Sequence, residues 1–183
     1  MPKNTSWIAS SATRTANAAA DPMHGTACAL VFGYGNPGRG DDALGPMLIE
    51  RLRGSEELCR ADEDIELLID FQLQPEHALD LRARRRVLFV DASSRCAEPF
   101  ELLRIAPAHD APVFTHALDP RALLAVFERI ERAPAPPSWV LAVRAYAFEL
   151  GEPLTARARE NLEAAFRCSR GWLAAGEDAT SPL

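Results

Sequence analysis

Hydrophobic residues recur along the chain with two different spacings, and these predict strands and helices in alternation. Continuous apolar runs at 27–32 and 87–90 are typical of strands buried on both faces of a sheet. Further apolar runs of strand length lie at 65–69, 100–105 and 139–146. The pattern therefore predicts about five strands.

Helical spacing appears between these runs. Apolar residues return every three or four positions after Asp42, and Gly54 ends that pattern. Asp119 and Thr155 are suitable N-caps for the last two helices, because a short oxygen-bearing side chain accepts a hydrogen bond from the first turn. The first predicted helix follows Asp42, and the others span 75–81, 120–130 and 154–173.

This alternation favours an α/β fold with three α/β/α layers around a mixed, mainly parallel sheet of about five strands. The link 92–99 between the third and fourth strands is too short for a parallel crossover. If these two strands pair, they pair antiparallel, which makes the sheet mixed. In such folds the functional groups lie at the carboxyl ends of the parallel strands.

Composition then restricts the class of protein. The 183 residues have 48% hydrophobic content, enough for one packed domain, and a net charge of −6 disfavours binding to nucleic acid or an anionic membrane. No apolar run approaches the roughly 20 residues of a membrane-spanning helix. Four cysteines without a Cys-x-x-Cys pair indicate idle thiols in a reducing cytoplasm. We expect a disordered extension over 1–26, or a true start at Met23, then one domain over 27–174 and a flexible tail over 175–183.

A glycine-rich turn after the first predicted strand has two interpretations. The run Gly33-x-Gly35-x-x-Gly38 satisfies the pattern of dinucleotide-binding turns. Against that interpretation, Pro37 removes one backbone N–H, and Asp41 and Asp42 place negative charge where a phosphate would lie. A nucleotide-binding oxidoreductase is therefore the alternative function.

Three residues near predicted strand ends have the chemistry of an open metal site. Asp42 follows the turn, Asp91 closes the third strand, and His116 precedes the helix that Asp119 caps. One histidine with two carboxylates suits a divalent ion such as nickel, zinc or iron. Each acid alone also has a structural explanation, since Asp41 or Asp42 can cap a helix and Asp91 can hydrogen-bond a turn.

The other histidines and the serines are weaker candidates for a functional site. His77 is expected on the surface of a helix, and His24 and His109 in loops. Ser93 and Ser94 lie in no recognisable hydrolase motif. The arginine-rich segment 82–86 is interpreted as the solvated end of a helix, with a docking patch for an acidic partner as the alternative.

Four blocks of the sequence are distinctive in combination. They are Gly33-Tyr-Gly-Asn-Pro-Gly-Arg-Gly-Asp-Asp-Ala-Leu-Gly45, Val87-Leu-Phe-Val-Asp-Ala92, Thr115-His-Ala-Leu-Asp-Pro120 and Gly151-Glu-Pro-Leu-Thr155. Together they resemble the [NiFe]-hydrogenase maturation endopeptidases, over about 27–173.

The resemblance implies an α/β/α fold of the phosphorylase/hydrolase-like type and a function. Proteases of this family remove a C-terminal extension from the [NiFe]-hydrogenase large-subunit precursor once nickel is in place. By position, Asp42, Asp91 and His116 match the family's metal-contacting and catalytic residues, with Asp41 as the alternative first acid. Nickel is then supplied by the precursor, so we expect no tightly bound cofactor of the protein's own. We also expect a monomer.

The chain departs from the family pattern at two places. Many members carry Glu where this chain has Asp42, which changes the reach of the carboxylate. The segment Phe71–His77 differs from the Gly-Thr-x-Gly type of stretch, which indicates a different hydrogenase as substrate. A different metallohydrolase and a non-catalytic large-subunit chaperone remain further alternatives.

Overall fold

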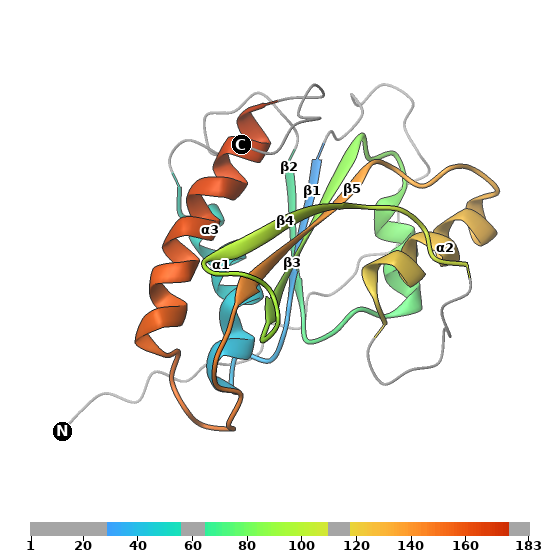
Figure 1. Cartoon of the computed structure of the whole chain (residues 1–183). Helices are drawn as coiled ribbons and strands as arrows, with labels where there is room; N and C mark the ends of the chain where they lie inside the picture. The colour runs from blue at the N-terminus through green and yellow to red at the C-terminus, as the bar shows by residue number, and fades with distance from the viewer. Residues whose placement is uncertain (1–28, 56–64, 110–117, 176–183) are drawn as a thin grey trace.

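The computed structural model describes residues 29–55, 65–109 and 118–175. Strands and helices alternate in it as predicted (Figure 1). In chain order the elements are β1 (Ala29–Tyr34), the 3-10 helix η1 (Gly40–Ala43), α1 (Leu44–Arg53), β2 (Ile65–Asp70), the 3-10 helix η3 (Pro75–Leu81), β3 (Arg86–Ser93), β4 (Phe100–Ile105), α2 (Pro120–Glu131), β5 (Ser138–Arg144) and α3 (Ala156–Ala174).

The five strands form one sheet in the order β2-β1-β3-β5-β4. The first four of these are parallel, and β4 runs antiparallel to β5, so the predicted mixed sheet is confirmed. The fourth strand pairs with β5 rather than with β3. Two strand spacings separate β3 from β4, roughly 10 Å, and the short link 94–99 is long enough to cross them.

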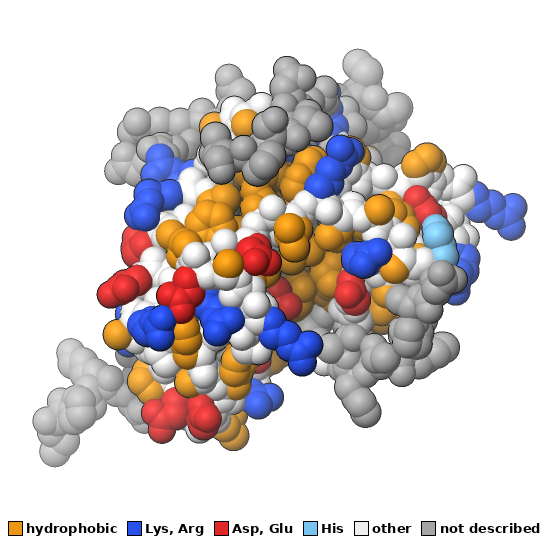
Figure 2. Space-filling model, in the orientation of Figure 1, with side chains coloured by type: hydrophobic (Ala, Val, Ile, Leu, Met, Phe, Trp, Pro, Cys, Tyr) orange, Lys and Arg blue, Asp and Glu red, His pale blue; other side chains and the backbone are white. Residues whose placement is uncertain are grey.

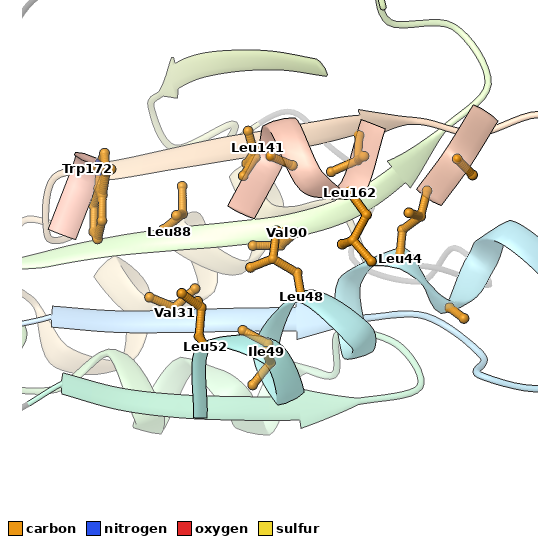
Figure 3. Packing of buried hydrophobic residues seen from close by; sticks show 14 of the residues in the cluster. Val31, Leu44, Leu48, Ile49, Leu52, Leu88, Val90, Leu141, Leu162 and Trp172 are labelled. Carbon is orange, nitrogen blue, oxygen red and sulfur yellow. The ribbon is translucent and has the colours of Figure 1, made fainter. Parts of the chain in front are cut away.

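Helices cover both faces of the sheet, which confirms the three layers (Figure 1). On one face α1 and α3 pack against alternate strand residues such as Val31 and Val90. Figure 3 shows Leu52 beside Val31, Leu48 beside Val90, and Leu44 of α1 beside Leu162 of α3. On the other face α2 and η3 cover the intervening residues, among them Leu30, Phe32 and Phe89. Strands buried on both faces explain the continuous apolar runs of the sequence.

The start of α1 presses directly onto the sheet. A Cβ atom on Gly45 would lie 2.4 Å from the Tyr34 carbonyl oxygen and 2.7 Å from that of Val90, so only glycine fits there. This close approach places the turn that carries Asp42 against the carboxyl ends of β1 and β3. The packing of one glycine therefore fixes where the candidate site lies.

The predicted helix caps are confirmed. The Asp119 carboxylate accepts a hydrogen bond from the Arg121 N–H at 2.7 Å, and the Thr155 hydroxyl accepts one from the Ala158 N–H at 3.2 Å. Pro120 is the first residue of α2, where its missing N–H costs no helical hydrogen bond.

Arginines of the segment 82–86 bind other elements, and the interpretation as a solvated helix end is wrong for two of them. Arg86 is buried and donates to the carbonyl oxygens of Trp172 and Leu173 at the end of α3, at 2.7 and 2.8 Å. Arg84 pairs with Glu66 of β2. Arg86 thus satisfies carbonyl oxygens at the end of α3, and Arg84 neutralises the half-exposed charge of Glu66.

At the β4 edge, hydrophobic side chains interrupt the charged surface over β4 and β5 (Figure 2), and Leu103 is 52% exposed.

Among the described residues, no helix has both the length and the apolar character needed to cross a membrane.

Candidate functional site

The neighbouring acids Asp41 and Asp42 differ completely in their surroundings. Asp41 is fully buried, and its carboxylate accepts four hydrogen bonds. The donors are the N–H groups of Tyr146, Ala147 and Thr155 and the Thr155 hydroxyl, at 2.7 to 3.2 Å. Its oxygens are therefore occupied within the protein, which favours Asp42 as the acid that is free to meet a ligand.

The loop 145–155 is attached to the glycine-rich turn by further bonds. The Gly40 N–H donates to the Glu152 carbonyl at 3.1 Å, and the Gly151 N–H donates to the Gly38 carbonyl at 2.8 Å. Gly40 and Gly151 both have positive φ, 53° and 83°, a conformation that glycine adopts without strain. The turn is thus supported by the loop that precedes α3.

Asp42 is partly buried, and its Oδ2 accepts the N–H of Asn36 at 3.0 Å. The turn folds closely around it, since a Cβ on Gly35 would lie 2.1 Å from the Asp42 carbonyl oxygen and Gly35 has a φ of 139°. Neither acid of the pair caps a helix through its side chain. The turn therefore encloses a carboxylate.

The same turn has no backbone donor left for a phosphate. Apart from Pro37, which lacks an N–H, every residue from Gly35 to Asp42 donates its N–H to an acceptor of the protein. The acceptors are Asp70 O, Asp42 Oδ2, Asn36 Oδ1, Asn36 O, Glu152 O, Ala147 O and Arg39 O. A dinucleotide turn needs free N–H groups facing the pyrophosphate, so this geometry disfavours the oxidoreductase alternative.

Asp91 lies within β3, which continues to Ser93 rather than ending at Asp91 as predicted. It is aligned with Ala142 of β5. The pKa of the Asp91 carboxyl is raised to about 7, mainly by burial and to a lesser extent by the negative charges of Asp42 and Asp119. Hydrogen bonds from Tyr34 and from the Ala92 backbone act in the opposite direction.

Tyr34 is a residue of this site that the sequence reasoning missed. Its hydroxyl is hydrogen-bonded to the Asp91 side chain, and its ring meets Phe32 edge-on at 6.4 Å. Burial raises the pKa of the Tyr34 phenol well above its ordinary value, and the charges of Asp91 and Asp119 add to the rise. The alternation of β1 was the available signal, because Tyr34 shares the face of Phe32.

Of the three predicted site residues, Asp42 and Asp91 are close enough for their charges to interact. His116 lies outside the described residues. Within 29–55, 65–109 and 118–175 no three His, Cys, Asp or Glu side chains are arranged to hold a metal ion. The described part of the predicted trio is thus a pair of acids.

His77 was predicted on the surface, and that prediction is wrong. Its side chain is buried against Phe32, with ring centroids 4.8 Å apart. Nδ1 accepts the Gln74 N–H at 2.9 Å, and Nε2 lies 3.2 Å from Asp70 Oδ2. The imidazole is satisfied by η3 and β2, because η3 turns this face toward the sheet.

The structure was compared with known structures. HycI, a [NiFe] hydrogenase maturation protease of Thermococcus kodakarensis, superposes with a TM-score of 0.62 at 23% identity, over 84% of this chain and 97% of that one. The hydrogenase maturating endopeptidase HybD of Escherichia coli gives 0.63 at 22% identity, over 80% and 92%. The chain has the fold of the hydrogenase maturation proteases.

The shared fold agrees with the resemblance found in the sequence blocks. A hydrogenase 2 maturation peptidase of a thaumarchaeon also has this fold, with a TM-score of 0.55 at 17% identity, over 79% of this chain and 97% of that one. No protein-family model and no curated protein matches the sequence. The maturation-protease fold is therefore recognised through the structure.

Proposed function

We propose that this protein is an endopeptidase that removes the C-terminal extension of a [NiFe]-hydrogenase large-subunit precursor after nickel insertion. The observation that carries the proposal is the approach of Asp42, in η1 after β1, to Asp91, in β3, at the carboxyl end of the sheet where ligands of α/β folds bind. The maturation-protease fold and the four sequence blocks support it.

The electrostatics of the pair favour a cation as ligand. Two carboxylates in a partly buried place repel one another, and the charge of Asp42 adds to burial, the main cause, in raising the pKa of Asp91. A divalent ion removes the repulsion and favours the ionised form of both groups. In the proposed reaction this ion is the nickel of the precursor, so it belongs to the substrate, and Asp42, Asp91 and His116 recognise it.

In the described part of the chain, the surroundings of Cys96, Cys168 and Ser93 disfavour a role as covalent nucleophile. Burial raises the pKa of the thiols of Cys96 and Cys168, which disfavours the reactive thiolate. The Ser93 hydroxyl accepts N–H groups of its own turn, from Arg95 and Cys96. Hydrolysis assisted by the Lewis acidity of the substrate's nickel suits this set of residues.

The test is mass spectrometry of a nickel-loaded precursor incubated with the protein. We expect loss of a C-terminal peptide, and no loss from nickel-free precursor. Asp91→Asn and His116→Ala should abolish processing, whereas Glu160→Gln, an exposed acid of α3, should leave it unchanged. Normal processing by either site variant would contradict the proposal.

Three further results would favour the alternatives. Binding of the precursor without any shortening indicates a chaperone. Saturable binding of NAD(P) in calorimetry indicates an oxidoreductase. A metal that stays with the purified protein in elemental analysis indicates a different metallohydrolase.

A further inference from the structure

Tyr34 and Asp91 are neighbours across the central strand pair. β1 and β3 are parallel with Gly33 beside Val90, which brings the next residues of the two strands, Tyr34 and Asp91, side by side at the carboxyl end of the sheet. Their side chains point to the same face, and the Tyr34 hydroxyl is hydrogen-bonded to Asp91. The contact joins a rigid ring to one member of the proposed nickel-recognising set.

The ring of Tyr34 has little freedom to move. Its edge packs on Phe32, and Phe32 is in turn stacked on Phe89 with ring centroids 6.4 Å apart. Phe32 and Phe89 belong to the buried cluster beneath α2. An aromatic side chain supported in this way presents its hydroxyl at a fixed point.

Asp91 needs a donor to keep its orientation. The charges that act on it come from Asp42 and Asp119, both acids, and repulsion alone would turn the carboxylate away from them. Its hydrogen bonds come from Tyr34 and from the Ala92 backbone. Of these two groups, Tyr34 is the side chain that a substitution can alter without changing the strand.

We propose that Tyr34 is a positioning residue, which holds one oxygen of the Asp91 carboxylate so that Asp91 meets the nickel of the precursor in one orientation. This inference rests on the proposed function. The phenol donates its O–H and stays protonated throughout, so no proton is transferred by Tyr34 in the reaction. Its contribution is geometric, and it acts through Asp91.

The test compares precursor cleavage by three variants. Tyr34→Phe keeps the ring and removes the donor, so we expect KM for nickel-loaded precursor to rise about tenfold while kcat changes less than about threefold. Replacing Tyr34 with para-aminophenylalanine restores an N–H donor and should return KM to within about twofold of the wild type. Tyr146→Phe, the control, removes the hydroxyl that accepts from Asn161 Nδ2 at 2.9 Å and should leave KM unchanged.

Each outcome decides the inference. An unchanged KM in Tyr34→Phe overturns the inference. A para-aminophenylalanine variant with a KM as high as that of Tyr34→Phe also overturns it, because an effect that the restored donor does not reverse indicates a purely structural role of the ring. If Tyr34→Phe does not fold, the KM of the para-aminophenylalanine variant is compared with that of the wild type. A value within about twofold supports the inference, and a larger rise overturns it. A wild-type protein that never shortens the precursor overturns the proposed function together with this inference, whereas wild-type processing with an unaffected Tyr34→Phe overturns this inference alone.

Discussion

The backbone N–H and the hydroxyl of Thr155 both donate to the carboxylate of Asp41, at 2.7 and 3.0 Å, although 114 positions of sequence separate the two residues. The N-cap of α3 is thereby bound to the turn that carries Asp42. The two neighbouring acids therefore have different roles. Asp41 holds the turn in place, and Asp42 faces the carboxyl end of the sheet.

Replacing Asp41 should weaken the fold far more than replacing Asp42. In Asp41→Asn the amide NH₂ faces groups that are themselves donors, and buried N–H groups lose their acceptor. We expect the free energy of unfolding in urea to fall by about 2–4 kcal/mol. Asp42→Asn is the control, with a loss below about 1 kcal/mol, because among the described residues the Asp42 side chain accepts one N–H, that of Asn36. Equal losses would contradict this division of tasks.

The stability of the free protein should depend on pH because Asp91 titrates at a different pH in the folded and unfolded states. Burial raises the pKa of Asp91 from 3.8 to about 7, so between these values the folded state holds a proton that the unfolded state has released. The contribution of this group to stability is complete below pH 3.8 and is lost as pH rises through about 7. The side chain of Asp91→Asn stays neutral at every pH. The free energy of unfolding of this variant, relative to that of the wild type, should therefore increase as pH rises across that window, by at most about 4 kcal/mol. Urea unfolding at several pH values measures this, and a constant difference would contradict it.

Tyr34 should ionise only at unusually high pH. The chain has two tyrosines, so Tyr146→Phe leaves Tyr34 as the single tyrosinate signal in ultraviolet absorbance. Because burial and the charge of Asp91 raise the pKa of Tyr34, we expect its midpoint well above 10 in the folded protein and near 10 in urea. Adding Asp91→Asn should lower the folded midpoint. A folded midpoint near 10 would show that Asp91 is not beside the phenol.

Gly45→Ala should disturb the packing of α1 on the sheet. The new methyl group would lie 2.4 Å from one backbone oxygen and 2.7 Å from another, and backbone cannot move aside cheaply. We expect a loss of about 2–4 kcal/mol in unfolding free energy. Gly54→Ala, at the end of the same helix, meets nothing closer than 3.7 Å and has a φ of −81°, so it should be neutral or slightly stabilising.

Local features were predictable from sequence because they depend on neighbouring residues. Asp119 and Thr155 were identified as N-caps from the residues around them, and the strand set followed from apolar runs. The position of β4 beside β5 was not predictable, since a short link permits either neighbour. Asp42 and Asp91 were selected as site residues by chemistry and resemblance, and His116 stays a prediction.

Long-range contacts account for what the sequence did not reveal. Asp41 and Asp42 are equivalent in local pattern, and they differ only because the donors to Asp41 lie more than 100 positions away. His77 is buried because η3 faces the sheet, which helical spacing alone does not orient. Tyr34 needed the parallel register of β1 and β3 before its partner was known.

The four donors to Asp41 all lie between Tyr146 and Thr155, more than 100 positions after Asp41. While the nascent chain is emerging from the ribosome, β1 and its turn exist without the loop that supports them until more than 100 further residues have been added. The hydrogen bonds that support this turn through Asp41 can therefore be complete only after Thr155, the N-cap of α3, has been added to the chain. A chain that stops before Tyr146 has both acids in its sequence but lacks all four of these donors to Asp41.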